Sequence, residues 1–315
     1  MQGFLELEDL VQTDYGATSV SVRLLAGGWD GSVYLVTRPQ GPPWVLRVVS
    51  RKSAQQDVTV LSFLESQHFP APRVIRSLNG CGTAPYGEQS VLVTTFIEGA
   101  PAGFSPRILH GVGETLGRLH TLYGAQVYTL LAAEMLPSTD MVIALDWLAG
   151  VEPRLPLGLR GQYDRLVEAI RDIRSYDHLP QALIHNDCHP GNAILTSAGP
   201  IMIDWHGAGL GPPVVDLGFL LTSCEIAPSW AAPLAPNSDR VVAIVDGYAR
   251  YRTPTVDELH WLPDAMRFRS LLYGAAHVAK CAEQGLETIS ETWWWERYEA
   301  ADEVATRARR RFNGH

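Results

Sequence analysis

The stretch that most constrains this chain runs from Leu183 to Trp205. It begins as LIHNDCHPGNAIL, which contains Asp187 and Asn192, and continues as PIMIDW, which places Asp204 on a second apolar run. The TSAG segment between the two runs is typical of a tight turn, so a short strand hairpin is predicted after the first loop. Three side chains that carry oxygen atoms are therefore expected on one loop and its return strand.

This set of side chains suits phosphoryl transfer, whose loose transition state needs positioning and charge neutralisation more than covalent help. Asp187 is predicted to accept or orient the proton of an attacking hydroxyl group. Asn192 and Asp204 are predicted to hold Mg²⁺ on the nucleotide phosphates, because this hard cation prefers oxygen ligands. Pro190 and Gly191 turn the chain between the base and the first metal ligand.

A zinc site is the alternative interpretation of the same stretch, because it also contains His185, Cys188, His189 and His206. Cysteine and histidine are the usual zinc ligands. Structural zinc patterns use paired CxxC or HxxxH units on separate turns. Phosphoryl transfer is therefore the preferred hypothesis.

Three motifs, HNDCHPGN, IDW and GPPVVDLGFLL, follow one another between Leu183 and Leu221. In order and spacing they resemble the aminoglycoside phosphotransferase and choline kinase superfamily, whose motifs are similar to HGDLHPGN, IDWE and GDPxxDLA. Weaker similarities extend back to about Leu24. Asn186, Cys188 and His206 depart from the family pattern.

The resemblance implies an α+β protein with a two-lobed, protein-kinase-like fold. An antiparallel sheet lobe that binds the nucleotide is expected over residues 1–90, a hinge over 91–99, and a larger, mainly helical catalytic and substrate-binding lobe over 100–315. Asp216 would brace the catalytic loop through backbone hydrogen bonds. It also begins an apolar helix, where a capping role is chemically ordinary.

The first expected hairpin contains the glycine-rich turn GGWDGS between the strands SVSVRLLAGG and VYLVTR. Gly27, Gly28 and Gly31 would let the backbone approach a bulky anion, and Ser32 would add a hydroxyl group. Such glycine clusters also occur in plain hairpins. The resemblance implies that this hairpin covers the nucleotide phosphates.

The next strand, WVLRVV, carries Arg47. The resemblance places Arg47 where kinases have a phosphate-pairing lysine, and arginine can grip two phosphate oxygens at once. Asp57 stands where the family has a glutamate partner for that cation, and Glu65 is the other candidate. A solvated strand residue is the alternative interpretation of Arg47. The backbone near Thr95 and Ile97 would, by the same resemblance, meet the adenine ring.

The remaining sequence predicts helices over residues 105–122, 159–179, 257–284 and 291–312. Consecutive side chains on a helix point about 100° apart, so Trp293, Trp294 and Trp295 should not all face one core. At least one is expected to line a cleft or a contact, the alternative being a helix buried on two sides. His120 is predicted to be a packed helix-end histidine, and the ARRRF segment a solvated helix end.

Composition limits the partners that this protein could have. The 315 residues are 46% hydrophobic, enough for a real core, and the formal net charge is −9. An acidic chain of this kind is not expected to bind nucleic acid or an anionic membrane surface. The surplus of acidic residues weakly favours a cationic acceptor. An amine could be held by acids of the C-terminal region, namely Glu225, Asp264, Glu283, Glu287, Glu291 and Glu296.

A cytoplasmic location is expected by default. The N-terminus MQGFLELEDLVQ has no basic region before an apolar stretch, and no apolar run is long enough to cross a bilayer. The four cysteines are scattered without paired spacing, which does not indicate a disulfide framework. The sequence leaves the oligomeric state open.

The combined hypothesis is a Mg²⁺-dependent O-phosphotransferase. It would use ATP or GTP to phosphorylate a hydroxyl group of a small molecule, such as an aminoglycoside-like or other hydroxylated antibiotic or metabolite. Antibiotic resistance is one biological role that such an activity would have. Two alternatives stay open: a non-catalytic nucleotide-binding scaffold, and a kinase that acts on protein serine or threonine. The short segment between Asp204 and Asp216 leaves no room for a conventional activation loop, which favours a small acceptor.

Overall fold

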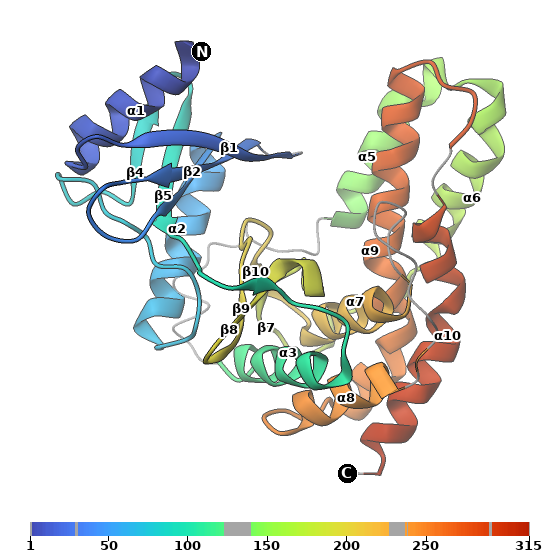
Figure 1. Cartoon of the computed structure of the whole chain (residues 1–315). Coiled ribbons are helices and arrows are strands. Elements are labelled where there is room, and N and C mark those ends of the chain that lie inside the picture. The colour runs from blue at the N-terminus through green and yellow to red at the C-terminus, as the bar shows by residue number, and fades with distance from the viewer. Residues whose placement is uncertain are drawn as a thin grey trace. The chain divides into compact units, whose positions relative to one another are not determined.

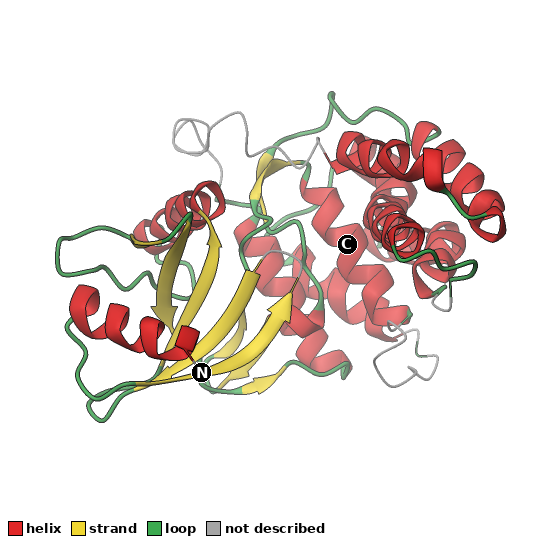
Figure 2. Ribbon diagram, turned by 90° about the horizontal axis from the view of Figure 1, so that it is seen from above, coloured by secondary structure: helices red, strands yellow, loops and turns green. Residues whose placement is uncertain are grey.

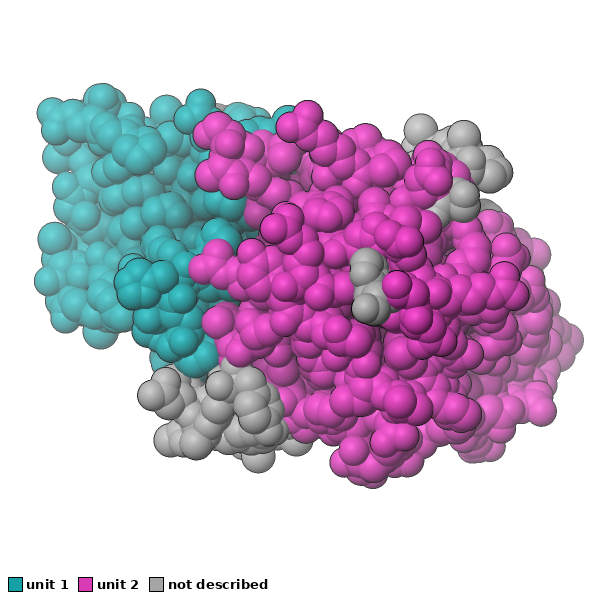
Figure 3. Space-filling model, turned by 90° about the horizontal axis from the view of Figure 1, so that it is seen from below, with its two compact units in different colours: residues 1–100, 201–206 teal, residues 101–200, 207–315 magenta. Residues whose placement is uncertain are grey.

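A computed structural model describes residues 2–28, 31–122, 140–226, 237, 239–289 and 292–314. The chain forms two compact units, which Figure 3 shows in different colours. Unit 1 comprises Met1–Ala100 and Ile201–His206, and unit 2 comprises Pro101–Pro200 and Gly207–His315. The short return of the chain to unit 1 contains Asp204.

Unit 1 is built on a five-stranded antiparallel sheet with the order β1-β2-β3-β5-β4 (Figures 1 and 2). Its strands are β1 (Ser21–Gly28), β2 (Gly31–Thr37), β3 (Trp44–Ser50), β4 (Thr83–Tyr86) and β5 (Gln89–Thr95). Two helices pack on the sheet, α1 (Gln2–Tyr15) and α2 (Arg51–Ser66).

The two faces of this sheet have different roles. Leu46 and Val48 of β3 are buried in a cluster with Leu7 and Val11 of α1. Because side chains alternate along a strand, Arg47 lies on the opposite face, which is covered by α2. The apolar alternation of the sequence thus fixes which side of the sheet carries the predicted phosphate-binding cation.

Unit 2 is mainly helical. Its described α-helices are α3 (Pro106–Leu119), α5 (Asp140–Val151), α6 (Arg160–Arg171), α7 (Pro213–Glu225), α8 (Asp239–Ala249), α9 (Val256–Glu283) and α10 (Trp293–Phe312). Helix α9 contacts α5, α6, α7 and α10 (Figure 1), and a capping box of Thr255 and Glu258 begins it. This helical part and the N-terminal antiparallel sheet confirm the predicted α+β class.

Short elements connect these helices and carry the motif region. They are β6 (Ala100–Pro101), η2 (Glu152–Arg154), η3 (Leu157–Leu159), β7 (Ala182–Ile184), η4 (Pro190–Asn192), β8 (Ala193–Thr196), β9 (Gly199–Met202) and β10 (Gly209–Gly211). Strand β7 pairs with β10 in antiparallel fashion. A two-residue turn joins β8 to β9, as the TSAG segment predicts.

Two helix predictions are corrected by the structure. The helix expected up to Leu179 ends at Arg171, because Ser175 and Asp177 form a local turn and Arg174 pairs with Asp264 instead of continuing the helix. The ARRRF segment is not simply solvated, since Arg311 binds both carboxylate oxygens of Asp246 at 2.5 and 2.7 Å. No helix in the described part of the chain is long and apolar enough to cross a membrane.

Candidate functional site

The predicted catalytic loop leaves the buried strand β7 and passes through η4 into β8. Its backbone is fixed by Asp216, which accepts the N–H groups of His185 and Asn186 at 2.7 Å each. Asn186 has a left-handed φ of 63°, which asparagine tolerates better than most residues. The predicted bracing role of Asp216 is therefore present. The alternative role of a helix cap is not seen, because α7 has no side-chain cap hydrogen bond.

A buried histidine completes the support of the loop. His120 Nε2 lies 3.1 Å from Asp216 Oδ2, and His120 Nδ1 lies 2.9 Å from the Tyr248 hydroxyl. A carboxylate only accepts, so Nε2 carries the proton and Nδ1 accepts from Tyr248. Burial lowers the pKa of His120 in spite of the nearby Asp216 carboxylate. His120 is thus a packed histidine, as predicted, and it also positions the loop through Asp216.

The carboxylate of Asp187 is held by three donors. Its Oδ1 accepts from the Tyr273 hydroxyl at 3.0 Å and from the Arg269 guanidinium at 3.2 Å, and its Oδ2 accepts from Asn192 Nδ2 at 2.8 Å. Burial alone would raise the pKa of Asp187, but the charges of Arg269 and His189 and the bond from Tyr273 hold the pKa well below its usual range. Asp187 is therefore ionised at neutral pH.

Arg269 and Tyr273, which hold Asp187 together with Asn192, were not predicted from the sequence. Arg269 also donates to Asp140 at 3.2 Å, and Asp140 accepts from the Asn186 side chain at 3.1 Å. Burial raises the pKa of Asp140, although Arg269 opposes this effect. The available signal was the spacing of Arg269 and Tyr273, which lie four residues apart and so share one face of α9.

Asn192 uses its side-chain N–H₂ group entirely on Asp187, through the carbonyl oxygen at 3.0 Å and Oδ2 at 2.8 Å. Within the described chain its Oδ1 accepts no hydrogen bond. This oxygen is chemically suited to a hard cation such as Mg²⁺. The structure thus brings together two of the predicted site residues, Asp187 and Asn192, in unit 2.

A second group of predicted site residues meets in unit 1. Arg47 NH1 lies 2.9 Å from Asp57 Oδ2 and 3.6 Å from Asp204 Oδ1. Asp57 is buried on α2, whereas Glu65 is exposed, so Asp57 is the partner that the sequence left undecided. Arg47 is not a solvated strand residue, since its side chain is only 15% exposed. Asp204 also contacts His206 Nδ1 at 2.8 Å.

The glycine-rich hairpin closes with Gly28 opposite Gly31 and Gly27 opposite Ser32. Gly31 has a φ of 126°, and an added Cβ would lie 2.2 Å from the carbonyl oxygen of Val48. The fold of the sheet therefore requires this glycine whether or not the hairpin binds phosphate.

The two backbone positions expected near adenine differ. The Thr95 N–H donates to the carbonyl oxygen of Arg73 at 2.9 Å, so this donor is occupied. Ile97 follows β5, and its backbone makes no hydrogen bond with the described residues. Ile97 is the better-placed of the two for pairing with a base.

The zinc interpretation lacks a ligand cluster. No group of three or more His, Cys, Asp or Glu side chains in the described ranges is arranged to hold a metal ion. Burial raises the pKa of the Cys188 thiol, which opposes the thiolate that zinc binds. The Nδ1 atoms of His185 and His189 instead accept N–H groups from within the loop, at 3.3 and 3.1 Å.

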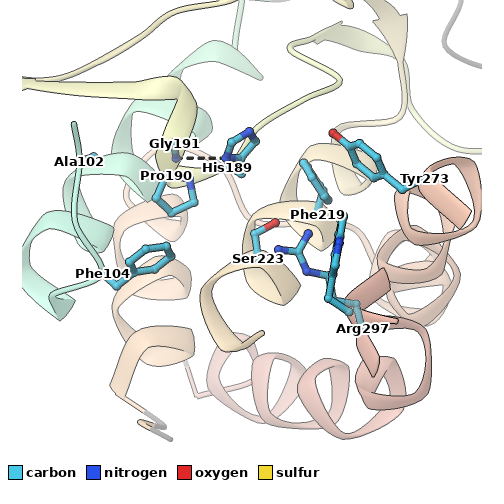
Figure 4. A pocket seen from close by; sticks show the side chains of 10 residues that line it. Ala102, Phe104, His189, Pro190, Gly191, Phe219, Ser223, Tyr273 and Arg297 are labelled. Carbon is cyan, nitrogen blue, oxygen red and sulfur yellow. Dashed lines mark hydrogen bonds between the residues drawn. The ribbon is translucent and has the colours of Figure 1, made fainter. Parts of the chain in front are cut away.

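A cavity of about 190 Å³ lies within unit 2, next to the catalytic loop (Figure 4). Tyr273, which donates to Asp187, also lines this cavity. Aromatic side chains dominate the wall, namely those of Phe104, His189, Phe219, Tyr273 and Trp293. One arginine, Arg297, also lines it. The cavity is thus adjacent to the carboxylate predicted to face an acceptor.

The expectation that the three consecutive tryptophans would not share a core is wrong, because Trp293 and Trp294 are buried in one hydrophobic cluster and Trp295 packs against it. Trp295 also stacks on Tyr298 with ring centroids 4.6 Å apart, and Trp293 also lines the cavity. The prediction that at least one tryptophan lines a cleft is confirmed by Trp293.

The acids proposed to hold an amine do not line this cavity. Glu225 pairs with Arg307 and Glu283 with Arg154, Asp264 pairs with Arg174, Glu287 accepts the Gly158 N–H, and Glu296 faces Thr292. Glu291 lies outside the described residues. Three of these acids therefore pair with arginines, and none of the described ones gives this cavity a negative wall.

Comparison with known proteins gives a protein family and solved structures of similar fold, three of which are described below. The sequence matches the model of the phosphotransferase enzyme family over residues 21–268. No curated protein sequence matches it significantly.

The amicoumacin kinase hAmiN, solved with AMP-PNP, Ca²⁺ and Ami, is 16% identical, with 96% of this chain and 93% of that chain covered and a TM-score of 0.68. Spectinomycin phosphotransferase APH(9)-Ia, solved with ADP and spectinomycin, is 15% identical over 98% of both chains, with a TM-score of 0.63. Choline kinase from Cryptosporidium parvum Iowa II is 12% identical over 98% of this chain and 95% of that chain, with a TM-score of 0.61. These similarities confirm the predicted protein-kinase-like fold.

Proposed function

Since the chain belongs to the phosphotransferase enzyme family, we propose that it transfers the γ-phosphoryl group of ATP to a hydroxyl group of a small molecule. The observation that carries this proposal is the ionised Asp187 carboxylate, fixed by Asn192, Arg269 and Tyr273 at the edge of a cavity. A fixed anion beside a cavity is what an attacking hydroxyl group needs for orientation.

Asp187 acts mainly by orientation. Its low pKa makes it a weak base, so it accepts a hydrogen bond from the acceptor hydroxyl group and takes the proton only as the new oxygen–phosphorus bond forms. The bonds from Arg269 and Tyr273 to Oδ1 keep the carboxylate in one orientation. Most of the contribution of this residue is therefore to geometry.

The nucleotide and metal are assigned to the predicted residues. Asn192 Oδ1 and the carboxylate of Asp204, which is 40% exposed, are each suited to Mg²⁺, because this cation prefers oxygen ligands. When bound, Mg²⁺ would neutralise charge on the β- and γ-phosphates. Arg47, held by Asp57, would pair with phosphate oxygens.

The hairpin of Gly28, Gly31 and Ser32 would cover the phosphates, and the backbone of Ile97 would meet adenine, with Thr95 beside it. ATP is preferred over GTP as the donor, because similar structures contain AMP-PNP and ADP. The acceptor is proposed to be a hydroxylated antibiotic or metabolite, since kinases of amicoumacin, spectinomycin and choline share this fold.

An acceptor screen tests the proposal. The purified protein is incubated with ATP and Mg²⁺ and with a panel of hydroxylated antibiotics, amino alcohols and hydroxy acids, and products are measured by mass gain of one phosphate. ADP release without and with each compound is recorded in parallel. ATP binding without ADP release under every condition would indicate a nucleotide-binding scaffold instead. Transfer to protein serine or threonine, with none to small molecules, would indicate a protein kinase.

A further inference from the structure

Arg297 is a buried cation that the proposed mechanism does not use. Its side chain is 3% exposed, and its guanidinium lies 4.6 Å from the centre of the Trp293 ring and 5.6 Å from that of Phe219. Its Nε–H donates to the carbonyl oxygen of Ile226 at 2.9 Å. Among the described residues its two terminal amino groups make no hydrogen bond, and no carboxylate lies within ion-pair distance.

A purely structural role explains only part of this arrangement. The bond to Ile226, which ends α7, is typical of a cation at a helix C-terminus. It uses one of the five N–H groups that an arginine offers. Buried charges in proteins are normally paired, because desolvation without a partner is costly. The remaining donors therefore point to a partner that enters from the cavity.

Ser223 supplies a second unsatisfied polar group at the same place. Its Oγ is buried and has no hydrogen-bond partner in the part of the chain that the structure describes. Figure 4 shows the Ser223 hydroxyl group beside the Arg297 guanidinium, and both residues line the cavity. The Ser223 hydroxyl group and the terminal amino groups of Arg297, which have no hydrogen-bond partner among the described residues, thus converge on one end of the cavity.

The rest of the cavity has little charge. Apart from the imidazole of His189, Arg297 is the one ionisable cation among the described residues of the wall, and none of those residues is acidic. Figure 4 shows Tyr273 and His189 at the end near the catalytic loop, and Phe219 between them and Arg297.

We infer that this cavity binds a carboxylate of the acceptor through Arg297 and Ser223, so that the acceptor is a compact hydroxy acid and not a polyamine. This inference rests on the proposed phosphotransferase function. A carboxylate matches the paired N–H groups of a guanidinium, and the serine hydroxyl group adds a third donor. The carboxylate would then bind at the Arg297 end while the acceptor hydroxyl group reaches Asp187 at the other.

Matched acids and esters test the inference by binding alone. Isothermal titration calorimetry is done with the full chain saturated with AMP-PNP and Mg²⁺, using para-hydroxymethylbenzoate, mandelate and their methyl esters as probes. The expected result is that at least one acid binds about 10- to 100-fold more tightly than its ester, the range for charge-assisted hydrogen bonds. Arg297→Met should abolish the difference, and Ser223→Ala should reduce it. Arg310→Met is the control, an exposed arginine on the same helix.

The outcomes separate the inference from the proposed function. Esters that bind as well as their acids, no binding by either acid, or an acid preference that survives Arg297→Met would overturn the inference. If Arg297→Met does not fold, a wild-type preference for the acids that Ser223→Ala reduces supports the inference, and a preference that Ser223→Ala leaves unchanged overturns it. Arg297-dependent binding of acids without phosphate transfer to any compound would instead count against the kinase assignment alone.

Discussion

The side-chain nitrogen of Asn192 donates to Asp187 Oδ2 at 2.8 Å. The amide nitrogen thereby fixes the proposed base, and the amide oxygen is the proposed metal ligand. If both roles hold, the orientation of the acceptor hydroxyl group and the binding of Mg²⁺ would be coupled through this single residue. Such a coupling would explain why the two residues are close in the loop.

Replacing Asp187 by Ala should reduce kcat by about 10²- to 10⁴-fold, the usual effect of losing a positioned acid or base. Binding of AMP-PNP should be retained, because Asp187 is assigned to the acceptor and not to the nucleotide. The measurement is steady-state ADP release with any acceptor that the screen identifies. Asp164→Ala, which removes an exposed carboxylate on α6, is the control. Wild-type turnover by the Asp187 variant would disprove its role.

Asp57→Ala should raise the KM for MgATP by about 10-fold or more, the effect of about 1.4 kcal/mol of lost binding free energy. Without Asp57, Arg47 would be drawn to Asp204, which lies 3.6 Å from it, and would compete with the metal. Glu65→Ala is the matched control on the same helix and should leave the KM unchanged. Equal effects of the two substitutions would mean that the ion pair has no role in nucleotide binding.

The stability of the protein should fall as the pH drops from 7 to 5, partly because of His120. Burial lowers the pKa of this histidine, an effect opposed by Asp216 and Glu258 and supported by Arg252, while Tyr248 caps its other nitrogen. Below about pH 6.5 the histidine is protonated in the unfolded state but stays neutral in the folded state. Protonation therefore favours the unfolded state, and the free energy of unfolding falls by up to about 1.4 kcal/mol per pH unit.

Urea denaturation of the wild type and of His120→Gln at pH 7, 6 and 5 measures this contribution. The variant should be less stable at pH 7, because it loses the hydrogen bond that supports Asp216. Its stability should then fall less between pH 7 and 5. A variant with the same or a steeper pH dependence would show that His120 is protonated in the folded state.

Local sequence pattern was sufficient to predict those parts of the fold and the site whose residues lie close together in the chain. Asp187 and Asn192 are five residues apart on one loop, so their placement on the same loop was predicted from spacing, although the hydrogen bond between them was not. The antiparallel strands and their glycine turn followed from alternation. The choice between Asp57 and Glu65 could also have been made, because Asp57 shares the buried face of α2 with Leu61 and Leu64.

The remainder of the site depends on tertiary packing. Arg269 and Tyr273 reach Asp187 across more than 80 residues of sequence, a separation that no local periodicity reports. The burial of Arg297 was not predicted, because the sequence around it is typical of an exposed helix rich in arginine. Only the packing of α10 against α7 shows that it is buried beside Phe219. The acidic surplus was misleading for the same reason, since three of the C-terminal acids proposed to hold an amine pair with arginines.

Arg297→Met should stabilise the protein although it removes a functional group. Burial lowers the pKa of Arg297 to about 10, so at pH 7 the side chain stays charged and the folded state bears a desolvation cost on the order of 3 kcal/mol. Methionine removes that cost and keeps the apolar contacts with Trp293 and Phe219. Loss of the bond to Ile226 offsets about 1 kcal/mol of the gain. The melting temperature of the variant should therefore rise by a few degrees in the absence of ligand, by about 2–4 °C per kcal/mol.

Arg307→Met is the contrast, because it leaves Glu225 unpaired and should lower the melting temperature. A lower melting temperature for Arg297→Met as well would mean that Arg297 holds α7 in place, and that its charge is satisfied in the free protein.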